Sequence, residues 1–476
     1  MASIFSKEKR IIYARKITGF WEEFKRKRIG LVGVSVLIFF LMLAVFAPWL
    51  TPYDPVARRR VAEDFAMPAW MTIFPKFKDY PLTQEFSLYW DMEQGLEFIK
   101  SWGKAVDVEY QATTMETIDV ELSTTFSYND IPPNAFYFKF EWQAEDVIST
   151  EYSVRIRLDT PEGENQTTYL MWSQPRIQQA KGAHVDVESV EPFFRDMLGF
   201  DMSENPAPVI FSQKGEYTLL LRMRFKPLSS NASCHIELMN GRFVIPGRVH
   251  GILGCDDTGA DLFSQLVYGT RISLMIGILC AVAGASIGIL VGVITGYFGG
   301  VLDEVMMRLV DILLCLPFLP LLLTLVFLYG KSIFYIVLFI AIFGWQGLAR
   351  MIRSQVLSIR ETSFIECARA AGASRFYIIM KHVVPNVLPV AFASLVLSVP
   401  GAILFEAALS FLGFGDPRVP TWGKMLHHAY GFGAFTRLAW WWIIPPGLCI
   451  TTLCLAFVFM GHSLDEVVNP RLRRRR

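Results

Sequence analysis

The sequence predicts a polytopic α-helical membrane protein with six membrane-spanning helices and a mainly β insert between the first two of them. Of its 476 residues, 53% are hydrophobic, and the mean hydropathy is +0.36, which a soluble protein of this size rarely reaches. A membrane-spanning helix needs about 20 mainly apolar residues. The segments that meet this requirement are Ile29–Leu50, Ile272–Tyr297, Met306–Leu328, Ile333–Leu348, Val387–Phe405 and Trp440–Met460.

Basic side chains predict the orientation of these spans. They cluster in residues 1–28, between the fourth and fifth spans, and after the sixth span. The positive-inside rule places all three regions in the cytoplasm, so both termini are expected there. The first span, residues 29–50, is expected to remain as an anchor, because its apolar run is too long for a signal peptide and no A-x-A cleavage site follows it. We interpret the basic runs as topology signals and predict no nucleic-acid site.

Residues 51–250 are expected outside the cytoplasm as an insert with a β-sandwich of roughly immunoglobulin size. Apolar and polar side chains alternate over residues 136–142, 154–158 and 219–225, which is typical of half-buried strands. Residues 62–104 are less regular and are expected to be helical or to wrap around the sandwich. The insert has no metal-ligand cluster, nucleophile elbow or paired carboxylates, so a structural or partner-binding role is favoured over catalysis.

The seven cysteines are scattered and include no C-x-x-C pair, so no structural zinc site is predicted. Cys234 and Cys255 lie in and just after the insert. They could form a disulfide in an oxidising compartment.

Residues 251–476 are expected to form the membrane core, and the most informative part of this core is the cytoplasmic stretch of about 351–386. Ile365, Ala368, Ala371 and Gly372 share one helix face. All but the first are small, so another protein's backbone could approach this face closely.

Local signals in the same stretch predict a short helix–turn–helix. Gly372 can adopt the left-handed conformation that ends a helix, and Ser374 can cap a second helix. Pro385 is expected to stop that second helix. Glu366 and Arg369 are three residues apart and could pair on the helix surface. A rigid hairpin fixed at both ends to membrane helices suits the transmission of force from a soluble partner.

The stretch from Phe364 to Asn386 resembles the EAA loop of permease subunits in binding-protein-dependent ABC importers. The matching residues are Glu366, Ala368, Gly372 and Pro385, with Cys367 where the family usually has its first alanine. The resemblance extends to the C-type permeases of dipeptide, oligopeptide and nickel importers over residues 20–57, 253–274, 400–426 and 465–473. It does not cover the insert.

The resemblance implies the type I ABC importer permease fold and a place in the prokaryotic inner membrane. In such importers two homologous permease subunits form the translocation path, two ATPase subunits bind ATP, and an extracytoplasmic binding protein delivers substrate. The family's coupling helix sits in a groove of the ATPase. By this resemblance, the residues expected to couple to the ATPase are Glu366, Cys367, Ala368, Arg369, Gly372, Arg375 and Pro385.

No catalytic residue, resident cofactor or metal site is predicted in the chain itself. Gly330-Lys331-Ser332 looks like the end of a phosphate-binding loop, but Leu325 stands where that motif needs glycine. His427 and His428 are adjacent in an expected outer loop, which is poor spacing for metal ligands.

Two acidic residues lie near or inside predicted spans and are candidates for the translocation path. Asp311 falls in the third span, where a structural hydrogen bond is the favoured role. Glu406 follows Pro400 and Gly401, where the family has a short re-entrant helix. Charged groups at membrane depth are costly and commonly face a cavity or a partner.

The function predicted from these observations is a permease subunit that carries di- or oligopeptides. The same importer architecture could carry oligosaccharides or nickel chelates. A membrane-anchored receptor would need a cytoplasmic effector domain, and a membrane enzyme would need clustered His, Asp or Glu at one membrane face. The sequence contains neither feature.

Overall fold

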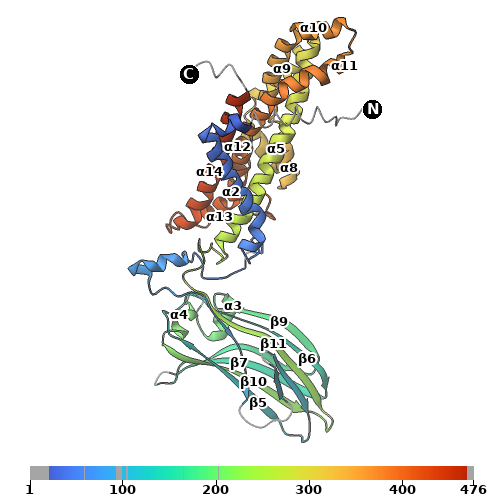
Figure 1. Cartoon of the computed structure of the whole chain (residues 1–476). Coiled ribbons are helices and arrows are strands. Elements are labelled where there is room, and N and C mark those ends of the chain that lie inside the picture. Colours follow the sequence, from blue (N-terminus) through green and yellow to red (C-terminus); the bar gives the residue numbers. More distant parts are fainter. Residues whose placement is uncertain are drawn as a thin grey trace. The chain divides into compact units, whose positions relative to one another are not determined.

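The computed structural model describes residues 21–57, 59–92, 99–102, 105–163, 166–201 and 203–468. The predictions that rest on basic residues 7–16 and 471–476 lie outside this part of the chain. The chain forms two compact units, Met1–Arg58 with Leu262–Arg476, and Arg59–Asp261. Figure 1 shows the first as a bundle of helices and the second as a mainly β unit.

The helical unit contains five helical stretches that are long and apolar enough to cross a membrane, or six if one bent pair counts as a span, among the described residues. Its helices are α2 (Arg28–Leu50), α5 (Leu262–Phe298), α6 (Gly300–Cys315), α7 (Phe318–Tyr329), α8 (Ile333–Ile342), α9 (Gln346–Arg360), α10 (Ser363–Ala370), α11 (Arg375–Ile378), α12 (Val384–Phe411), α13 (Trp422–Gly431) and α14 (Trp440–Val468).

The expectation of one continuous span over Met306–Leu328 is wrong. Helices α6 and α7 meet at an angle of 87°, with Leu316 extended (ψ 134°) and Pro317 preceding α7. The residue before a proline is disfavoured in the α-helical region, and proline itself cannot donate a backbone hydrogen bond. The apolar run is therefore divided at this dipeptide, although its mean hydropathy is that of a single span.

The expected boundaries of the fourth span also need correction. Helix α8 ends at Ile342, and α9 starts at Gln346 and continues to Arg360, well beyond the expected end at Leu348. Ala349, Ile352 and Val356 are buried along one side of α9. This spacing places them on one helix face, so α9 is held by packing although it carries several arginines.

Helix α12 differs from the sequence expectation at both of its informative prolines. Pro385 lies in its first turn, where the missing N–H would have no helical partner in any case, so this proline does not stop a helix. A π-helical turn over Ile379–Val383 joins α11 directly to α12. The helix also continues through Pro400 and Gly401, so the break and re-entrant helix expected there are absent from this described segment.

Helix α5 is the central packing element of the helical unit. At Gly292, a Cβ atom would lie 2.6 Å from the Ala349 carbonyl oxygen and 2.8 Å from Ile352 Cβ. A side chain at this position would force α5 and α9 apart, and the glycine therefore permits their close approach. Towards the start of α5, Leu266 O accepts a hydrogen bond of 3.0 Å from Trp422 Nε1 of α13, which ties α13 to α5.

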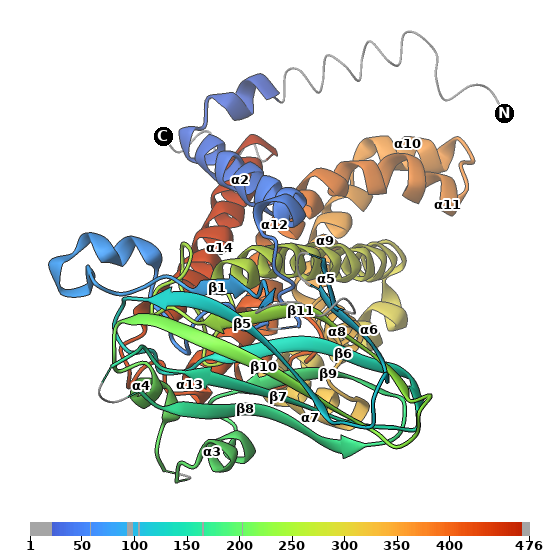
Figure 2. The same cartoon turned by 90° about the horizontal axis from the view of Figure 1, so that it is seen from below.

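The β unit contains two antiparallel sheets that face each other (Figures 1 and 2). One sheet has the order β3-β4-β11-β6-β9, with β1 also paired to β11, and the other has the order β2-β5-β10-β7-β8. The strands are β1 (Gln84–Ser87), β2 (Asp91–Met92), β3 (Ile99–Trp102), β4 (Ala105–Gln111), β5 (Ile118–Tyr128), β6 (Tyr137–Ile148), β7 (Thr150–Asp159), β8 (Thr168–Ile177), β9 (Lys181–Glu188), β10 (Gly215–Pro227) and β11 (Ser233–Ile245). A β-rich region is thus present, and β6, β7 and β10 contain the three alternating stretches seen in the sequence, except for Phe136, which lies just before β6.

Aromatic side chains from both sheets form the core between them. The rings of Phe126 and Phe136 both stack on Phe243, at centroid distances of 5.0 and 5.5 Å. Phe211 meets Phe136 edge-on at 5.5 Å. Cys234, buried in this core, is a free thiol, as is Cys255. The disulfide considered for these two residues does not form in this structure.

Ionic contacts line the outer face of the second sheet. Arg224 lies directly opposite Asp119 in the pairing of β10 with β5 and donates hydrogen bonds of 2.6 and 2.8 Å to its carboxylate. Arg222 adds a third bond of 2.7 Å. These hydrogen bonds, from Arg224 first, hold the pKa of Asp119 down at about 2.

Candidate functional site

The predicted cytoplasmic stretch folds into a helical hairpin at one end of the helical unit (Figure 1). We call residues 363–378, comprising α10, the turn and α11, the coupling hairpin. In its turn, Gly372 has a φ of +79°, and Ala373 N donates to Ala368 O at 3.1 Å. This arrangement ends α10 as expected from the glycine. Ser374 Oγ accepts a hydrogen bond of 3.3 Å from Tyr377 N, so the predicted cap of the second helix is present.

Two isoleucines anchor the coupling hairpin to the membrane helices. Ile365 and Ile378 are almost completely buried and pack in one cluster with Val293 and Tyr297 of α5 and Val356 of α9. From the sequence, Ile365 was expected on the same helix face as Ala368, Ala371 and Gly372, open to a partner. In the structure, the Ile365 end of this face packs against the protein's own core. Ala368 is half-buried against the same cluster, and only Ala371 and Gly372 at the far end are exposed.

Most of the residues expected to couple to the ATPase are exposed. Glu366, Cys367, Arg369, Gly372, Arg375 and Pro385 all face solvent, whereas Ala368 does not. Glu366 and Arg369 are both described, and no ion pair joins them. The coupling hairpin thus presents its charges singly on the surface, where a partner's side chains can reach them.

A groove of about 720 Å³ runs beside the coupling hairpin. Its lining combines two aromatic residues of α5 with charged residues at the end of α9, just after it and in the coupling hairpin. The lining residues are Tyr297, Phe298, Arg360, Glu361, Glu366, Arg369, Ala373, Ser374, Arg375 and Ile378. The arginines outnumber the glutamates, so an acidic surface would complement this groove.

Sequence reasoning missed the exposed aromatic residues of α11. Phe376 is 74% exposed and Tyr377 50% exposed, although both lie beside the buried Ile378. Large aromatic side chains on a solvent-facing turn are enriched at protein interfaces. The Ser374 cap could have indicated this arrangement, because it sets where α11 begins and therefore which side chains share a face. Ile378 then points inward, while Phe376 and Tyr377 point outward.

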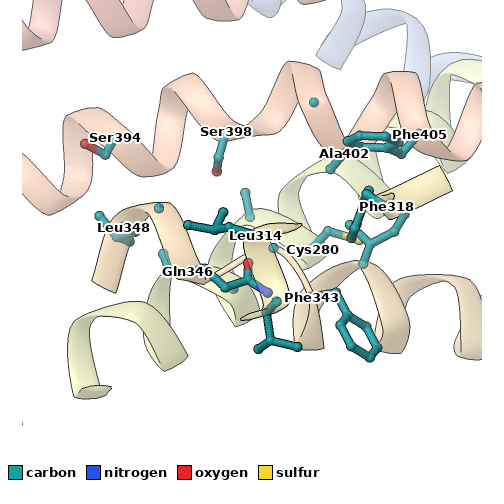
Figure 3. Close-up of a pocket in the computed structure, with 18 of the residues that line it drawn as sticks. Cys280, Leu314, Phe318, Phe343, Gln346, Leu348, Ser394, Ser398, Ala402 and Phe405 are labelled. Carbon is teal, nitrogen blue, oxygen red and sulfur yellow. The ribbon is translucent and has the colours of Figure 1, made fainter. Parts of the chain in front are cut away.

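A second candidate site is a cavity of about 390 Å³ inside the helical unit (Figure 3). Its walls come from α5, α6, α7, α8, α9 and α12, and they are mainly apolar. Gln346, Ser394 and Ser398 provide polar side chains. Figure 3 shows the Ser398 hydroxyl and the Gln346 amide on opposite walls of the cavity. Such a cavity can hold an uncharged or backbone-like group with few fixed polar contacts.

Neither acidic candidate from the sequence lines this cavity. Asp311 of α6 is about half exposed and forms an ion pair with Arg350 of α9. Glu406 is 2% exposed, and its Oε1 accepts a hydrogen bond of 2.6 Å from Ser410 Oγ. Phe405, one residue earlier, does line the cavity. A role for either acid in translocation stays a prediction.

An ion pair between α6 and α9 had no signal in the sequence beyond its charges. Arg353 Nη2 donates to Asp303 Oδ2 at 2.6 Å, and Arg353 Nε donates to the other carboxylate oxygen. The Asp303–Arg353 and Asp311–Arg350 ion pairs together hold α6, the first helix of the bent pair, against α9.

The histidine pair lies in a helix instead of the expected loop. His427 and His428 belong to α13, and His427 Nδ1 lies 2.7 Å from Phe411 O. Among the described residues, no group of three or more His, Cys, Asp or Glu side chains could hold a metal ion.

Comparison with known proteins places this architecture in a family. Residues 288–474 match the family model described as "Binding-protein-dependent transport system inner membrane component". Residues 18–68 match the "N-terminal TM domain of oligopeptide transport permease C". The first match includes the coupling hairpin, α9 and α12.

Curated relatives agree with the family models. The oligopeptide transport system permease protein OppC of Haemophilus influenzae is 40% identical over 223 residues, which are 46% of this chain and 70% of that protein. The dipeptide transport system permease protein DppC of Bacillus subtilis is 35% identical over 222 residues, 46% of this chain and 69% of that protein.

Among solved structures, the MetNI methionine ABC transporter in an inward-facing conformation is similar at 20% identity, with a TM-score of 0.36 over 43% of this chain and 96% of that one.

The family matches and the apolar helices identify a multi-pass inner membrane protein with a type I ABC permease fold. The chain belongs to the C-type permease subunits of peptide ABC importers.

Proposed function

We propose that this chain forms half of the translocation pathway for di- or oligopeptides and is driven through its coupling hairpin by separate ATPase subunits. The observation that carries the proposal is the hairpin itself, with its left-handed Gly372 and capped α11. It lies within the residues that match the permease family model. The relatives named for oligopeptide and dipeptide transport support peptides as the cargo.

The coupling hairpin and the cavity share the same helices, which supports a mechanical link between them. Val293 of α5 packs in the hairpin's cluster, and Gly284 of the same helix lines the cavity. Nine residues separate them, which is about 14 Å along a helix. Because packed helices move as rigid elements, a shift of the hairpin displaces the cavity wall.

We infer that the working importer contains a second homologous permease, two ATPase subunits and an extracytoplasmic binding protein. The ATPase subunits bind ATP and hydrolyse it, and this chain needs no cofactor of its own. The arginine-rich groove beside the coupling hairpin fits an acidic surface on the ATPase. The exposed Phe376 and Tyr377 supply apolar contact area next to it.

The topology we propose has six spans, with the bent pair α6–α7 as one of them, both termini in the cytoplasm and the β unit outside. Native Cys367 on the coupling hairpin is exposed. In right-side-out vesicles it should be protected from a membrane-impermeant maleimide, while a cysteine placed at Ile148 in the β unit should be labelled. The reverse pattern would overturn the orientation without affecting the family assignment.

The test of function is ATP-driven uptake of labelled peptides by the complete importer in proteoliposomes. We expect unlabelled peptides to compete and oligosaccharides or nickel chelates to have no effect. Uptake of an oligosaccharide in place of peptide would contradict the proposed peptide cargo but would still support the permease role. A complete, ATP-hydrolysing importer that accumulates none of these solutes would contradict the proposal.

A further inference from the structure

The β unit carries an exposed apolar loop close in sequence to its first connection with the helical unit. We call residues 68–82 the aromatic loop. It contains two short 3₁₀ helices, Ala69–Ile73 and Pro75–Phe77. Ile73 is 81% exposed, Phe74 52% and Trp70 42%. Single exposed apolar residues are normal, but a group of large ones marks an interaction surface.

The aromatic loop is held in place by the polypeptide that leads back to the membrane helices. Trp70 Nε1 donates to Ile252 O at 3.0 Å. Ala69 N donates to Gly251 O at 2.9 Å, and His250 N donates to Met67 O at 2.8 Å. Ile252 is itself 56% exposed and extends the apolar surface. These bonds fix the loop, so its exposure is a property of the folded unit.

Chain connectivity keeps the aromatic loop within reach of a bilayer. Cys255 pairs with Asp261 in an isolated β-bridge, and Asp261 directly precedes α5. The path from Ile252 to Asp261 through this bridge is roughly 16 Å, from three residues and one strand spacing. The apolar part of α5 begins near Ile272, about 15 Å further along the helix. Ile252, which accepts the Trp70 hydrogen bond, is therefore no more than about 30 Å along this path from the apolar part of α5, whichever face of the membrane the β unit occupies.

The side chains of the aromatic loop have the chemistry of the membrane interface. Tryptophan is enriched where headgroups meet hydrocarbon, and lysine extends its ammonium towards the phosphates. Lys76 and Lys78 lie on either side of Phe77, after Trp70, Ile73 and Phe74 and before Asp79, and Lys76 Nζ lies 5.5 Å from the centre of the Phe77 ring. An apolar tip with adjacent cations is the composition of interfacial segments that bind anionic lipid.

We propose that the aromatic loop is a lipid anchor of the β unit, with Ile73, Phe74 and the indole of Trp70 inserted at headgroup depth. The anchor is separate from the spanning helices and from the coupling hairpin. It limits the motion of the β unit relative to the membrane. A protein that docks on the same residues is the competing occupant, and the experiment below separates the two.

The test places the photo-crosslinking amino acid p-benzoylphenylalanine at Ile73 of the full chain, in vesicles of phosphatidylethanolamine and phosphatidylglycerol. The matched control is the same substitution at Ile148, which is 57% exposed. Ile148 pairs at the Ser233 end of β11, whereas the chain returns to the membrane from the Ile245 end. Both sites are exposed on the same unit, so neither substitution should prevent folding.

We expect several-fold more phospholipid adduct, by mass spectrometry, from position 73 than from position 148. Vesicles of phosphatidylcholine alone should give less adduct at position 73, because the lysines lose their anionic partners. Equal yields of phospholipid adduct at positions 73 and 148 would contradict the proposal that the aromatic loop is a lipid anchor. Adducts at position 73 that contain protein instead of lipid, in the complete importer with its binding protein, would also overturn it and identify a docking surface.

Discussion

Replacing Gly372 by alanine adds a Cβ atom to a residue whose φ is +79°. No atom lies within 4 Å of that Cβ position, so the effect comes from the backbone alone. The left-handed conformation costs an L-residue about 1–2 kcal/mol. The turn is closed by hydrogen bonds from Gly372 N and Ala373 N, each worth about 0.5–1.5 kcal/mol. The penalty is as large as one of these bonds and lowers the population of the native turn by about 5- to 30-fold relative to competing turns.

The assay for Gly372→Ala is ATP-driven peptide uptake together with ATP hydrolysis by the complete importer. We expect uptake to fall several-fold while hydrolysis persists, because in the proposed mechanism a displaced α11 transmits less of the ATPase's motion. The control is Gly330→Ala, in the turn between α7 and α8, where no atom lies within 4 Å of the added Cβ. Its φ of 104° and ψ of 157° lie in a region that is essentially restricted to glycine, so alanine is strained there as well. This variant should leave the ratio of uptake to hydrolysis unchanged. Normal coupling in the Gly372 variant, or equal loss in both variants, would refute the reasoning.

Three further changes have defined outcomes. Ser374→Ala removes the α11 cap and should cost about 1 kcal/mol locally, seen as faster amide exchange in α11; unchanged exchange would contradict the capping role. Arg353→Gln leaves Asp303 without its bidentate partner and should lower unfolding free energy by about 1–3 kcal/mol. Adding Asp303→Asn should recover part of this loss in thermal unfolding, and an additive loss would argue against the pair. The pKa of Asp119 is lowered from 3.8 to about 2 in the folded protein. The ionised carboxylate therefore stabilises the β unit above pH ~4, and this contribution to the free energy of unfolding is lost as the pH falls towards ~2. Partial exposure limits it to about 1–2 kcal/mol, and Asp119→Asn should reduce the acid sensitivity of unfolding over that range.

Local signals explain why the coupling hairpin was largely predictable. A left-handed glycine and a serine cap act within a few residues, so Gly372 and Ser374 fixed the turn without tertiary information. The alternating strands β6, β7 and β10 were visible for a similar reason, since one face of each is buried. Ile365 was misjudged because a helix face can be assigned from spacing, while its direction depends on the neighbouring α5 and α9.

Helix boundaries in the membrane unit were less predictable. Hydropathy is averaged over a window of residues, so it does not detect the bend at Leu316 and Pro317, which lies within one apolar run. The rule that proline stops a helix failed at Pro385, which lies in a first turn. The cavity lay beyond prediction, because Cys280, Gln346 and Ser398 are far apart in the chain and meet only through helix packing.

Photo-crosslinking from native Cys367 tests the central claim most directly. The thiol is exposed on α10, and a Cys315→Ser background removes the other exposed cysteine among the described residues. A benzophenone maleimide attached to Cys367 in the complete importer should crosslink to the ATPase subunit, with a yield that changes when ATP is added. Adding Cys367→Ser to this background should abolish the product. Labelled Cys367 that reaches only lipid or water in a transporting complex would contradict the account.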